Sequence, residues 1–288
     1  MNISIIGGSG RMGKWLARFL KKEGFDVTII GRDPDSVQKA GLEIGCRATT
    51  DLSRVTESQT IILSVAINAF EEVVKKFAPL THENQMIFDI TSVKMMPVEI
   101  MNSTITRGTT LGTHPVFGPG ARGVSGQNFV LTPTSDRQIN LAEKASAFLE
   151  KRGAHVRMMS PEEHDRLMAI ILGLAHFISI VSASTLVDYG ELEKLSSVQG
   201  VTYRALLTLI ESVLSEDPEL YASLQMNLPH LKNAQELLIE NAKRWSEMVL
   251  QKDRESFVDQ MVKLRERFEK NNPDFGKAYD NMYRLVDR

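Results

Sequence analysis

The chain has 288 residues, of which 42% are hydrophobic and 24% are charged, and its formal net charge is -2 at neutral pH. This composition is that of a globular protein large enough to bury its own core, in one large or two ordinary domains. The small net charge offers no basic face for nucleic acid. Cys46 is the only cysteine, which excludes an intrachain disulfide and a cysteine-based metal cluster.

The beginning of the sequence predicts an intracellular, soluble protein. Strand-like residues start at once, and no charged segment precedes a long apolar stretch, as it would in a secretory signal. No window is expected to approach the roughly 20 apolar residues that cross a bilayer. We therefore expect a cytoplasmic protein that has neither a membrane nor a nucleic acid as a partner.

Up to about residue 158, short apolar, β-branched runs alternate with amphipathic helical stretches. The expected strands are Ile3–Ile6, Val27–Ile30, Thr60–Val65, Met86–Ile90, Asn128–Leu131 and His155–Met158. Helical spacing is found in Lys14–Lys22, Ala69–Phe77 and Leu141–Lys151. This alternation, with strands that are apolar throughout, predicts a doubly wound parallel α/β sheet of the Rossmann type.

After residue 160 the pattern becomes helical. Ser160 and Pro161 are typical of an N-cap and a first helical position. The helices expected beyond them are Glu162–Tyr189, Tyr203–Leu214, Leu231–Leu250 and Arg254–Phe268. The sequence therefore predicts a dinucleotide-binding domain over residues 1–160 and an all-helical domain over residues 161–288.

The predicted helix Glu162–Tyr189 is unusually long and apolar nearly all round. Such a helix must be buried from several sides. Packing inside the helical domain is one explanation, and burial against a second copy of the chain is another. We favour the second, and so expect a homodimer.

A glycine-rich motif of the form G-x-G-x-x-G follows the first predicted strand directly and opens a helix. In dinucleotide-binding folds, Gly8 permits a tight turn, Gly10 lets the backbone approach a pyrophosphate, and Gly13 lets helix and strand pack closely. The helix N-terminus then offers free N–H groups to the phosphates. The candidate cofactor contacts in the motif are Gly8, Ser9, Gly10, Arg11, Met12 and Gly13.

The end of the second strand indicates which dinucleotide is bound. Enzymes that use NAD usually have an acid there, which accepts hydrogen bonds from the adenosine ribose. This chain has Gly31 instead, followed by Arg32, whose guanidinium can pair with a 2′-phosphate. Asp33 is close by and could instead turn toward the ribose. We expect NADP to be favoured over NAD.

Two polar groups follow further predicted strands, at the edge where ligands bind doubly wound sheets. His114 lies in the segment Thr113–Gly120, next to a proline-rich loop, and its ordinary pKa suits a general base. Ser92 lies in Asp89–Lys94, a segment that offers hydroxyls and an ammonium to the same cleft. A serine after a strand is equally common as a helix cap.

The predicted helical domain holds further candidates, which are weak by themselves. His164 and His176 share one predicted helix but are too far apart for an adjacent metal pair, and no H-E-x-x-H pattern is present. We expect no bound metal. Arg204 could hold a substrate carboxylate with two hydrogen bonds, or it could be an exposed helix residue.

Several separated segments together resemble the prephenate dehydrogenase family over nearly the whole chain. The most specific is the block Gly-Thr-His-Pro-Val-Phe-Gly-Pro at 112–119, followed at suitable distance by Ser-Pro-Glu-Glu-His-Asp at 160–165 and Leu-Ala-His-Phe at 174–177. The other matching segments are 7–13, 89–94, 203–204 and 217–221.

This resemblance implies the oxidative decarboxylation of prephenate to 4-hydroxyphenylpyruvate, with hydride transfer to a nicotinamide, in tyrosine biosynthesis. It implies that His114 accepts the proton of the ring hydroxyl and that Ser92 helps to orient this hydroxyl. It also implies that His176 and Arg204 bind substrate and that His164 lies near the same pocket. A homodimer formed through the helical domain is implied as well.

Three alternatives stay open. Arogenate dehydrogenase carries out the same chemistry on a substrate with an amino group in place of the keto group. Another NADP-dependent hydroxyacid reductase would have the same architecture, but such enzymes typically use a catalytic lysine in the helical domain. A non-catalytic NADPH-sensing protein would keep the glycines and would need none of His114, His176 and Arg204.

Overall fold

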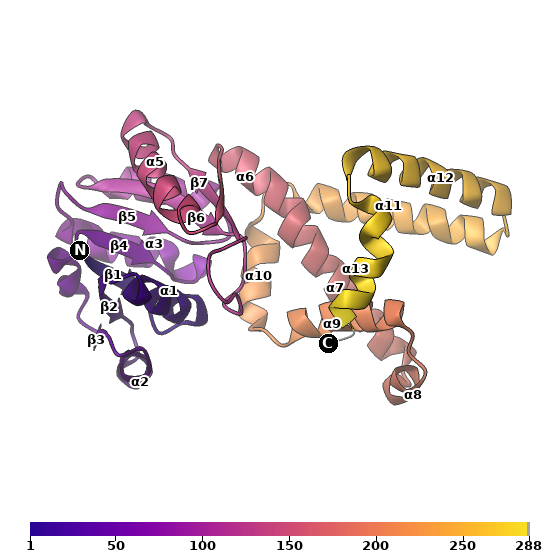
Figure 1. Ribbon diagram of the computed structural model, residues 1–288, viewed down its shortest axis with the longest axis horizontal. Coiled ribbons are helices and arrows are strands. Elements are labelled where there is room, and N and C mark those ends of the chain that lie inside the picture. Colours follow the sequence, from indigo (N-terminus) through magenta and orange to yellow (C-terminus); the bar gives the residue numbers. More distant parts are fainter. Residues whose placement is uncertain (287–288) are drawn as a thin grey trace. The chain divides into compact units, whose positions relative to one another are not determined.

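A computed structural model describes residues 1–286, which pack as two compact units (Figure 1). The N-terminal unit comprises Met1–Met168 together with Met226–Leu228, and the C-terminal unit comprises Ala169–Gln225 and the chain from Pro229 onward. The packing thus changes from one unit to the other at Met168, within the long predicted helix. That the dinucleotide-binding domain ends at residue 160 and the helical domain begins there stays a prediction.

The N-terminal unit is built on one eight-stranded sheet with the order β3-β2-β1-β4-β5-β6-β7-β8. Its strands are β1 (Asn2–Ile6), β2 (Asp26–Ile30), β3 (Arg47–Thr49), β4 (Thr60–Leu63), β5 (Met86–Asp89), β6 (Thr109–Pro115), β7 (Asn128–Thr132) and β8 (His155–Met158). All neighbouring strands are parallel except the antiparallel pair β6–β7. The predicted doubly wound sheet is confirmed, with β3 and β6 as strands that the apolar runs did not indicate.

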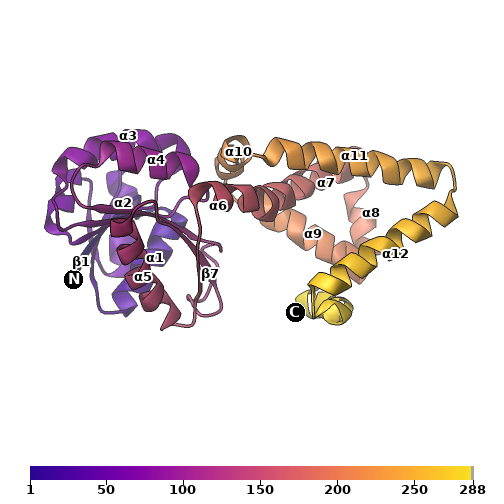
Figure 2. The ribbon, with the colours of Figure 1, turned by 90° about the horizontal axis from the view of Figure 1, so that it is seen from above.

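Helices cover both faces of this sheet, because successive residues of a strand point to opposite faces. Ile5 packs in one apolar cluster and its neighbour Ile6 in the other. The first cluster includes residues of α1 (Arg11–Lys22), α2 (Pro34–Ile44) and α5 (Asp136–Glu150), and the second includes residues of η1 (Leu52–Glu57), α3 (Ile67–Phe77), η2 (Ala78–Leu80) and α4 (Met95–Thr104). Figure 2 shows α3 and α4 on the opposite side of the sheet from α1 and α5. Because helices cover the two faces, we expect a ligand site at the edge formed by the carboxyl ends of the parallel strands.

The chain beyond residue 160 is helical, as predicted. Its elements are α6 (Pro161–Met168), a π-helical stretch η3 (Ala169–Leu174), α7 (Ala175–Tyr189), α8 (Leu192–Ser197), α9 (Val201–Leu214), α10 (Pro218–Asn227), α11 (Leu231–Leu250), α12 (Arg254–Asn271), η4 (Phe275–Lys277) and α13 (Ala278–Val286). Within the C-terminal unit, α9 packs against α7 and α13, and α11 packs against α12.

The segment Pro161–Tyr189 is long and apolar enough to cross a membrane, by length and composition alone. Our expectation that no window approaches this limit was wrong, since the charged residues of the segment other than Asp188 are gathered in its first turns and leave a long apolar stretch. Within this segment, only 28% of the 18-residue stretch that meets the membrane criterion is buried inside the single chain. A helix with this composition needs more cover than one chain gives it.

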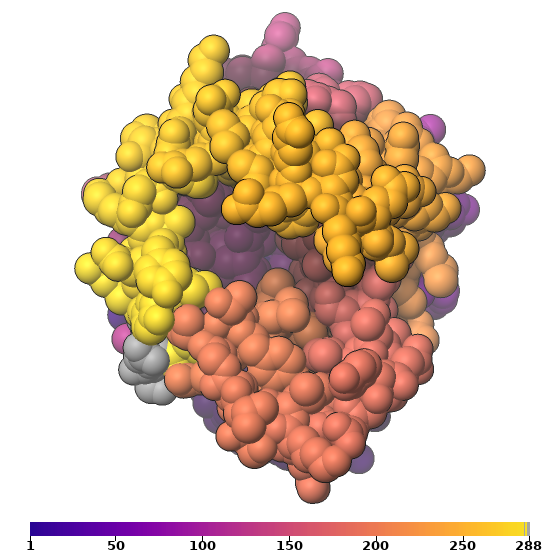
Figure 3. All heavy atoms as spheres, turned by 90° about the vertical axis from the view of Figure 1, so that its right-hand side faces the viewer, coloured from indigo at the N-terminus to yellow at the C-terminus, as the bar shows by residue number. Residues whose placement is uncertain are grey.

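The C-terminal unit as a whole leaves many apolar side chains exposed. They include Val181, Val187, Leu209, Leu237, Ile239, Val258, Met261 and Phe268. Figure 3 shows a hollow between the helices of this unit, bordered by the yellow C-terminal helices and the orange segment around α9. Exposed apolar patches of this extent mark surfaces that bind a partner.

Candidate active site

The glycine-rich loop joins β1 to α1 by close backbone packing. A Cβ at Gly8 would lie 2.5 Å from Cβ of Ile29 and 2.9 Å from the Ile5 carbonyl oxygen, and a Cβ at Gly13 would lie 2.4 Å from the Gly7 carbonyl oxygen. The left-handed residue of the turn is Gly7, with φ of 79°. The tight turn that we assigned to Gly8 therefore belongs to Gly7, while Gly8 and Gly13 let loop, strand and helix approach one another.

This loop also fits a pyrophosphate. The N-cap of α1 is Gly10, which has no side chain to cap the helix. No side-chain cap therefore occupies the N-terminus of α1, at the positive end of the helix dipole, where a helix binds an anion. The Ser9 hydroxyl lies toward the end of β2, since a Cβ at Gly31 would be 3.1 Å from its Oγ.

The end of β2 has room for only a small residue. A Cβ at Gly31 would also lie 3.2 Å from Cβ of Val37, so an acidic side chain there would need its neighbours to shift. Asp33 is the N-cap of α2, and its Oδ1 accepts a 2.6 Å hydrogen bond from the backbone N–H of Ser36. Arg32 is exposed. The guanidinium of Arg32 is thus accessible at the end of β2, whereas the carboxylate of Asp33 is used to cap α2.

The candidate base His114 lies at the carboxyl end of β6 with only 3% of its surface exposed. Its Nδ1 lies 2.8 Å from Nε2 of His164 in α6. Nδ1 of His164 lies 2.7 Å from Oδ1 of Asp165, so both ring nitrogens of His164 form hydrogen bonds within the protein. The structure thus brings together two histidines that are 50 residues apart in the sequence.

Asp165 is held by the beginning of α4. Its Oδ1 accepts a 2.7 Å hydrogen bond from the backbone N–H of Lys94, and its Oδ2 accepts one of 2.9 Å from that of Met95. These donors are orphan groups at a helix N-terminus, where a carboxylate is stabilised by the helix dipole. Asp165 is 1% exposed, and the two backbone hydrogen bonds fix its position.

Lys94 and Asp89 form a second buried pair beside the histidines. The ammonium of Lys94 donates to Oδ1 of Asp89 and, over 2.7 Å, to the carbonyl oxygen of Thr113. Both charged side chains are fully buried. The ammonium that we expected in the cleft is therefore used inside the protein.

Burial determines the protonation of these groups. It lowers the pKa of His114 well below its ordinary 6.5, and the nearby His164 and Lys94 lower it further. Burial also lowers the pKa of His164, although the hydrogen bond to Asp165 opposes this shift. Both imidazoles are therefore neutral at neutral pH, as a general base must be before it accepts a proton.

Ser92 is half-buried in the loop between β5 and α4. The alternative role as a helix cap does not apply, because the N-cap of α4 is Lys94 and the first-turn N–H groups bind Asp165. Since β5 and β6 are parallel neighbours, Ser92, just after β5, and His114, near the end of β6, lie at the same edge of the sheet.

His176 and Arg204 belong to the C-terminal unit, at the start of α7 and of α9. Nδ1 of His176 is buried and has no hydrogen-bond partner among residues 1–286, and its ring meets that of Tyr221 edge-on at 4.9 Å between centroids. Arg204 is half-buried, and its Nη2 donates a 2.6 Å hydrogen bond to the carbonyl oxygen of Val286 in α13.

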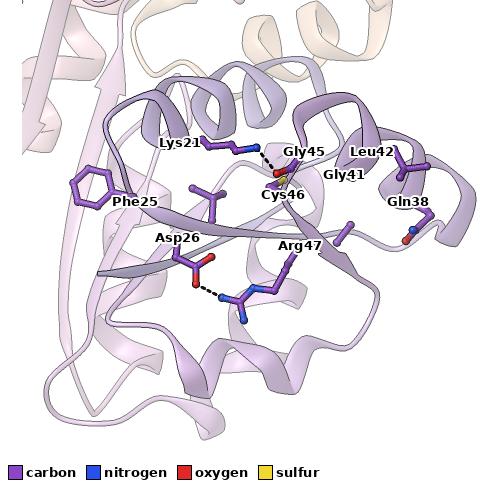
Figure 4. A pocket seen from close by; sticks show the side chains of 11 residues that line it. Lys21, Phe25, Asp26, Gln38, Gly41, Leu42, Gly45, Cys46 and Arg47 are labelled. Carbon is purple, nitrogen blue, oxygen red and sulfur yellow. Dashed lines mark hydrogen bonds and ion pairs between the residues drawn. The ribbon is translucent and has the colours of Figure 1, made fainter.

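A separate hollow of about 560 Å³ lies in the N-terminal unit, at the amino ends of β2 and β3 (Figure 4). Its charged groups are already paired: Arg47 with Asp26 at 2.6 Å, and Lys21 with the carbonyl oxygens of Ile44 and Gly45. Burial raises the pKa of the Cys46 thiol. This hollow lies at the opposite edge of the sheet from the glycine loop.

Three residues of the site region were not among the candidates from sequence: Gly7, Asp89 and Asp165. Asp165 is adjacent to His164 in the matching segment 160–165, and this adjacency is the signal that could have indicated it. Across residues 1–286, no group of three or more His, Cys, Asp or Glu side chains is arranged to hold a metal ion.

Two family models match consecutive parts of the chain. "Prephenate dehydrogenase, nucleotide-binding domain" matches residues 16–158, and "Prephenate dehydrogenase, dimerization domain" matches residues 160–263. The probable arogenate/prephenate dehydrogenase of Methanocaldococcus jannaschii is 37% identical over 275 residues, which are 93% of this chain. The match spans 61% of the length of that relative.

Solved structures of similar fold cover almost the whole chain. Prephenate dehydrogenase from Aquifex aeolicus, in complex with hydroxyphenyl propionate and NAD+, has a TM-score of 0.78 at 22% identity, over 94% of this chain and 98% of the other. Synechocystis arogenate dehydrogenase has a TM-score of 0.73 at 19% identity, over 94% and 100%. At these identities the similarity concerns the fold, and the family follows from the two family models and the Methanocaldococcus relative: the chain belongs to the prephenate dehydrogenase family.

Proposed function

We propose that this chain catalyses the oxidative decarboxylation of prephenate to 4-hydroxyphenylpyruvate, in tyrosine biosynthesis, with NADP+ as the hydride acceptor. The observation that carries the proposal is the neutral, buried imidazole of His114 at the edge of the sheet that also holds the glycine loop. The oxidation of an alcohol beside a bound nicotinamide needs a base at this edge of the sheet.

In this proposal His114 is the catalytic base. The ring hydroxyl of the substrate donates a hydrogen bond to Nε2 of His114, and its proton moves to that nitrogen while hydride leaves the same carbon. The bound nicotinamide accepts this hydride. Loss of carbon dioxide then makes the ring aromatic, which drives the step forward. Ser92, half-buried at the same edge, orients the hydroxyl.

We assign substrate recognition to His176 and Arg204. The buried, unpartnered Nδ1 of His176 supports this, because a buried polar atom is stabilised when a ligand supplies its hydrogen bond. Arg204 carries the guanidinium that a dianionic substrate needs, and a guanidinium binds a carboxylate through charge-assisted hydrogen bonds.

For the cofactor, we assign the pyrophosphate to the loop of Gly8, Ser9 and Gly10 and to the first turn of α1. The NAD+ in the Aquifex structure supports a nicotinamide dinucleotide. Our preference for NADP rests on exposed Arg32 and on Asp33, which caps α2. The guanidinium would bind the 2′-phosphate.

We further propose a cytoplasmic homodimer. The exposed apolar surface of the C-terminal unit and the match to a dimerization domain support it. The apolar segment Pro161–Tyr189 would then be covered by the second copy, and no membrane is needed to bury it. Sedimentation that finds only monomer at working concentration contradicts the dimer.

Arogenate is the alternative substrate, because the Methanocaldococcus relative is a probable arogenate/prephenate dehydrogenase. One experiment tests substrate and cofactor together. Purified protein is mixed with prephenate or arogenate and with NADP+ or NAD+, and the absorbance of the reduced cofactor is followed. We expect the fastest reduction with prephenate and NADP+. A faster rate with arogenate would reassign the substrate, and no reduction in any mixture would contradict the proposed function.

A further inference from the structure

Three buried side chains of the N-terminal unit form a continuous line of hydrogen bonds that ends at the proposed base. Oδ1 of Asp165 lies 2.7 Å from Nδ1 of His164, and Nε2 of His164 lies 2.8 Å from Nδ1 of His114. The exposed fractions of the three residues are 1%, 0% and 3%. The line therefore leaves one ring nitrogen of His114, Nε2, for a ligand.

The direction of donation along this line begins at Asp165. Its two oxygens accept hydrogen bonds from the backbone N–H groups of Lys94 and Met95, and an N–H can only donate. Bound in this way at a helix N-terminus, the carboxylate is ionised and acts only as an acceptor. Nδ1 of His164 must therefore carry the hydrogen that points at Oδ1 of Asp165.

The state of His164 then follows from its surroundings. A neutral imidazole with hydrogen on Nδ1 has its lone pair on Nε2, which can only accept. The charged groups near this ring are Asp165, Lys94 and Asp89; burial lowers the pKa of His164, and the ammonium of Lys94 also opposes a second positive charge. Nε2 of His164 thus accepts a hydrogen bond from Nδ1–H of His114.

We infer that Asp165 and His164 are positioning residues that hold His114 in the tautomer with hydrogen on Nδ1 and a lone pair on Nε2. This is the tautomer that a base facing the substrate requires. In the proposed reaction the O–H bond of the substrate breaks and its proton bonds to Nε2 of His114, while the hydrogen on Nδ1 stays in place. The positive charge that develops is stabilised through His164 by the carboxylate of Asp165.

The role of His114 as a base rests on the proposed function, but its tautomer can be measured without substrate. Protein labelled with 15N in histidine is studied by long-range 1H–15N NMR, and His114→Asn identifies the signals of His114. We expect a protonated Nδ1 and an unprotonated Nε2 on His114 at neutral pH. Hydrogen on Nε2 of His114 would overturn the inference.

A pair of variants at His164 separates positioning from packing. His164→Gln keeps an acceptor, the amide oxygen, that can reach Nδ1–H of His114, whereas His164→Leu removes it. In both variants Asp165 keeps its two backbone hydrogen bonds, so its charge stays solvated by the protein. We expect the His114 tautomer to persist in His164→Gln and to become mixed in His164→Leu and in Asp165→Asn.

Kinetics provide the second readout. We expect kcat of His164→Gln to stay within about 10-fold of the parent and that of His164→Leu to fall about 10²-fold or more, with KM changed little. Gln138→Leu is the matched control, since it removes a buried amide with several hydrogen bonds in the same unit, outside the site. It is expected to lower stability and to leave kcat unchanged.

Equal kcat values for His164→Gln and His164→Leu would overturn the inference, because only a packing role treats the two variants alike. If the parent protein reduces no cofactor with any substrate, the proposed function fails, and the NMR result alone then decides the tautomer. The two failures are therefore distinguishable.

Discussion

Lys94 and Asp89 form an ion pair whose two side chains are completely buried, at the point where β5 ends and the chain turns toward α4. The same ammonium donates to the carbonyl oxygen of Thr113, the residue before the proposed base. The pair therefore connects the ends of the neighbouring strands β5 and β6, next to His114. Removing one partner of such a pair leaves the other charged and without a counter-ion in a medium that solvates it poorly.

Lys94→Met is expected to lower the free energy of unfolding by about 3–5 kcal/mol, since it leaves the Asp89 carboxylate unpaired. The double variant Lys94→Met/Asp89→Asn is expected to recover part of that loss, because no charge then stays buried. Urea unfolding of the parent, the single variants and the double variant measures both effects. If the losses in the free energy of unfolding of the two single variants add up in the double variant, Lys94 and Asp89 are not coupled, and the prediction is contradicted.

Stability is expected to fall as the pH drops below the ordinary histidine pKa of 6.5. Burial lowers the pKa of both His114 and His164 in the folded protein, so the unfolded chain binds protons first as the pH falls. Their contribution is complete above pH 6.5 and is lost between that value and the lower folded pKa, by at most about 1.4 kcal/mol per pH unit for each group.

Urea unfolding at several pH values between about 7.5 and 5 measures this slope. The double variant His114→Asn/His164→Gln removes both titrating groups and is expected to have a shallower slope, while Asp89, Lys94 and Asp165 remain. An unchanged slope in that variant would assign the dependence to other groups, such as His176, whose pKa burial also lowers.

Arg32→Ala is expected to weaken the use of NADP selectively. Loss of charge-assisted hydrogen bonds to the 2′-phosphate should raise KM for NADP about 10- to 100-fold and leave KM for NAD within about twofold. Michaelis constants for both cofactors measure this. Arg137→Ala, which removes an exposed arginine from α5, is the control. A similar rise for both cofactors would contradict a contact with the 2′-phosphate.

Arg204→Ala is expected to raise KM for the substrate about 10- to 100-fold with a smaller effect on kcat, because it removes the cation proposed to bind a carboxylate. The variant also loses the hydrogen bond to Val286, so its thermal unfolding is measured in parallel. Arg204→Lys keeps the charge and is expected to have an intermediate KM. An unchanged KM in Arg204→Ala would exclude it from substrate binding.

Apolar β-branched runs were sufficient to predict most of the sheet, but they did not indicate β6. Its sequence, TTLGTHP, contains one large apolar residue, so no hydrophobic run marks it. The strand is determined by its two neighbours: the Thr113 hydroxyl donates to the Asp89 carbonyl oxygen, and a Cβ at Gly112 would lie 2.3 Å from Oγ1 of Thr132. Such pairing between distant segments is not visible in local periodicity.

The candidate site was predictable to a similar degree. The glycine loop follows a predicted strand, and this order in the sequence indicates its edge of the sheet. His114, which we expected just after a strand, lies within β6 near its carboxyl end. The buried partners do not follow from local sequence. Lysine and aspartate after strands are usually exposed, and only the fold shows that Lys94 meets Asp89 and that Asp165 binds the first turn of α4.

The most direct test of the central claim is the turnover of His114→Asn, compared with His82→Asn as a histidine control in the same unit. The account predicts that kcat of His114→Asn with prephenate falls about 10²–10⁴-fold, with cofactor binding retained and His82→Asn unaffected. Near-normal turnover of His114→Asn would show that another group accepts the proton, and would contradict the account.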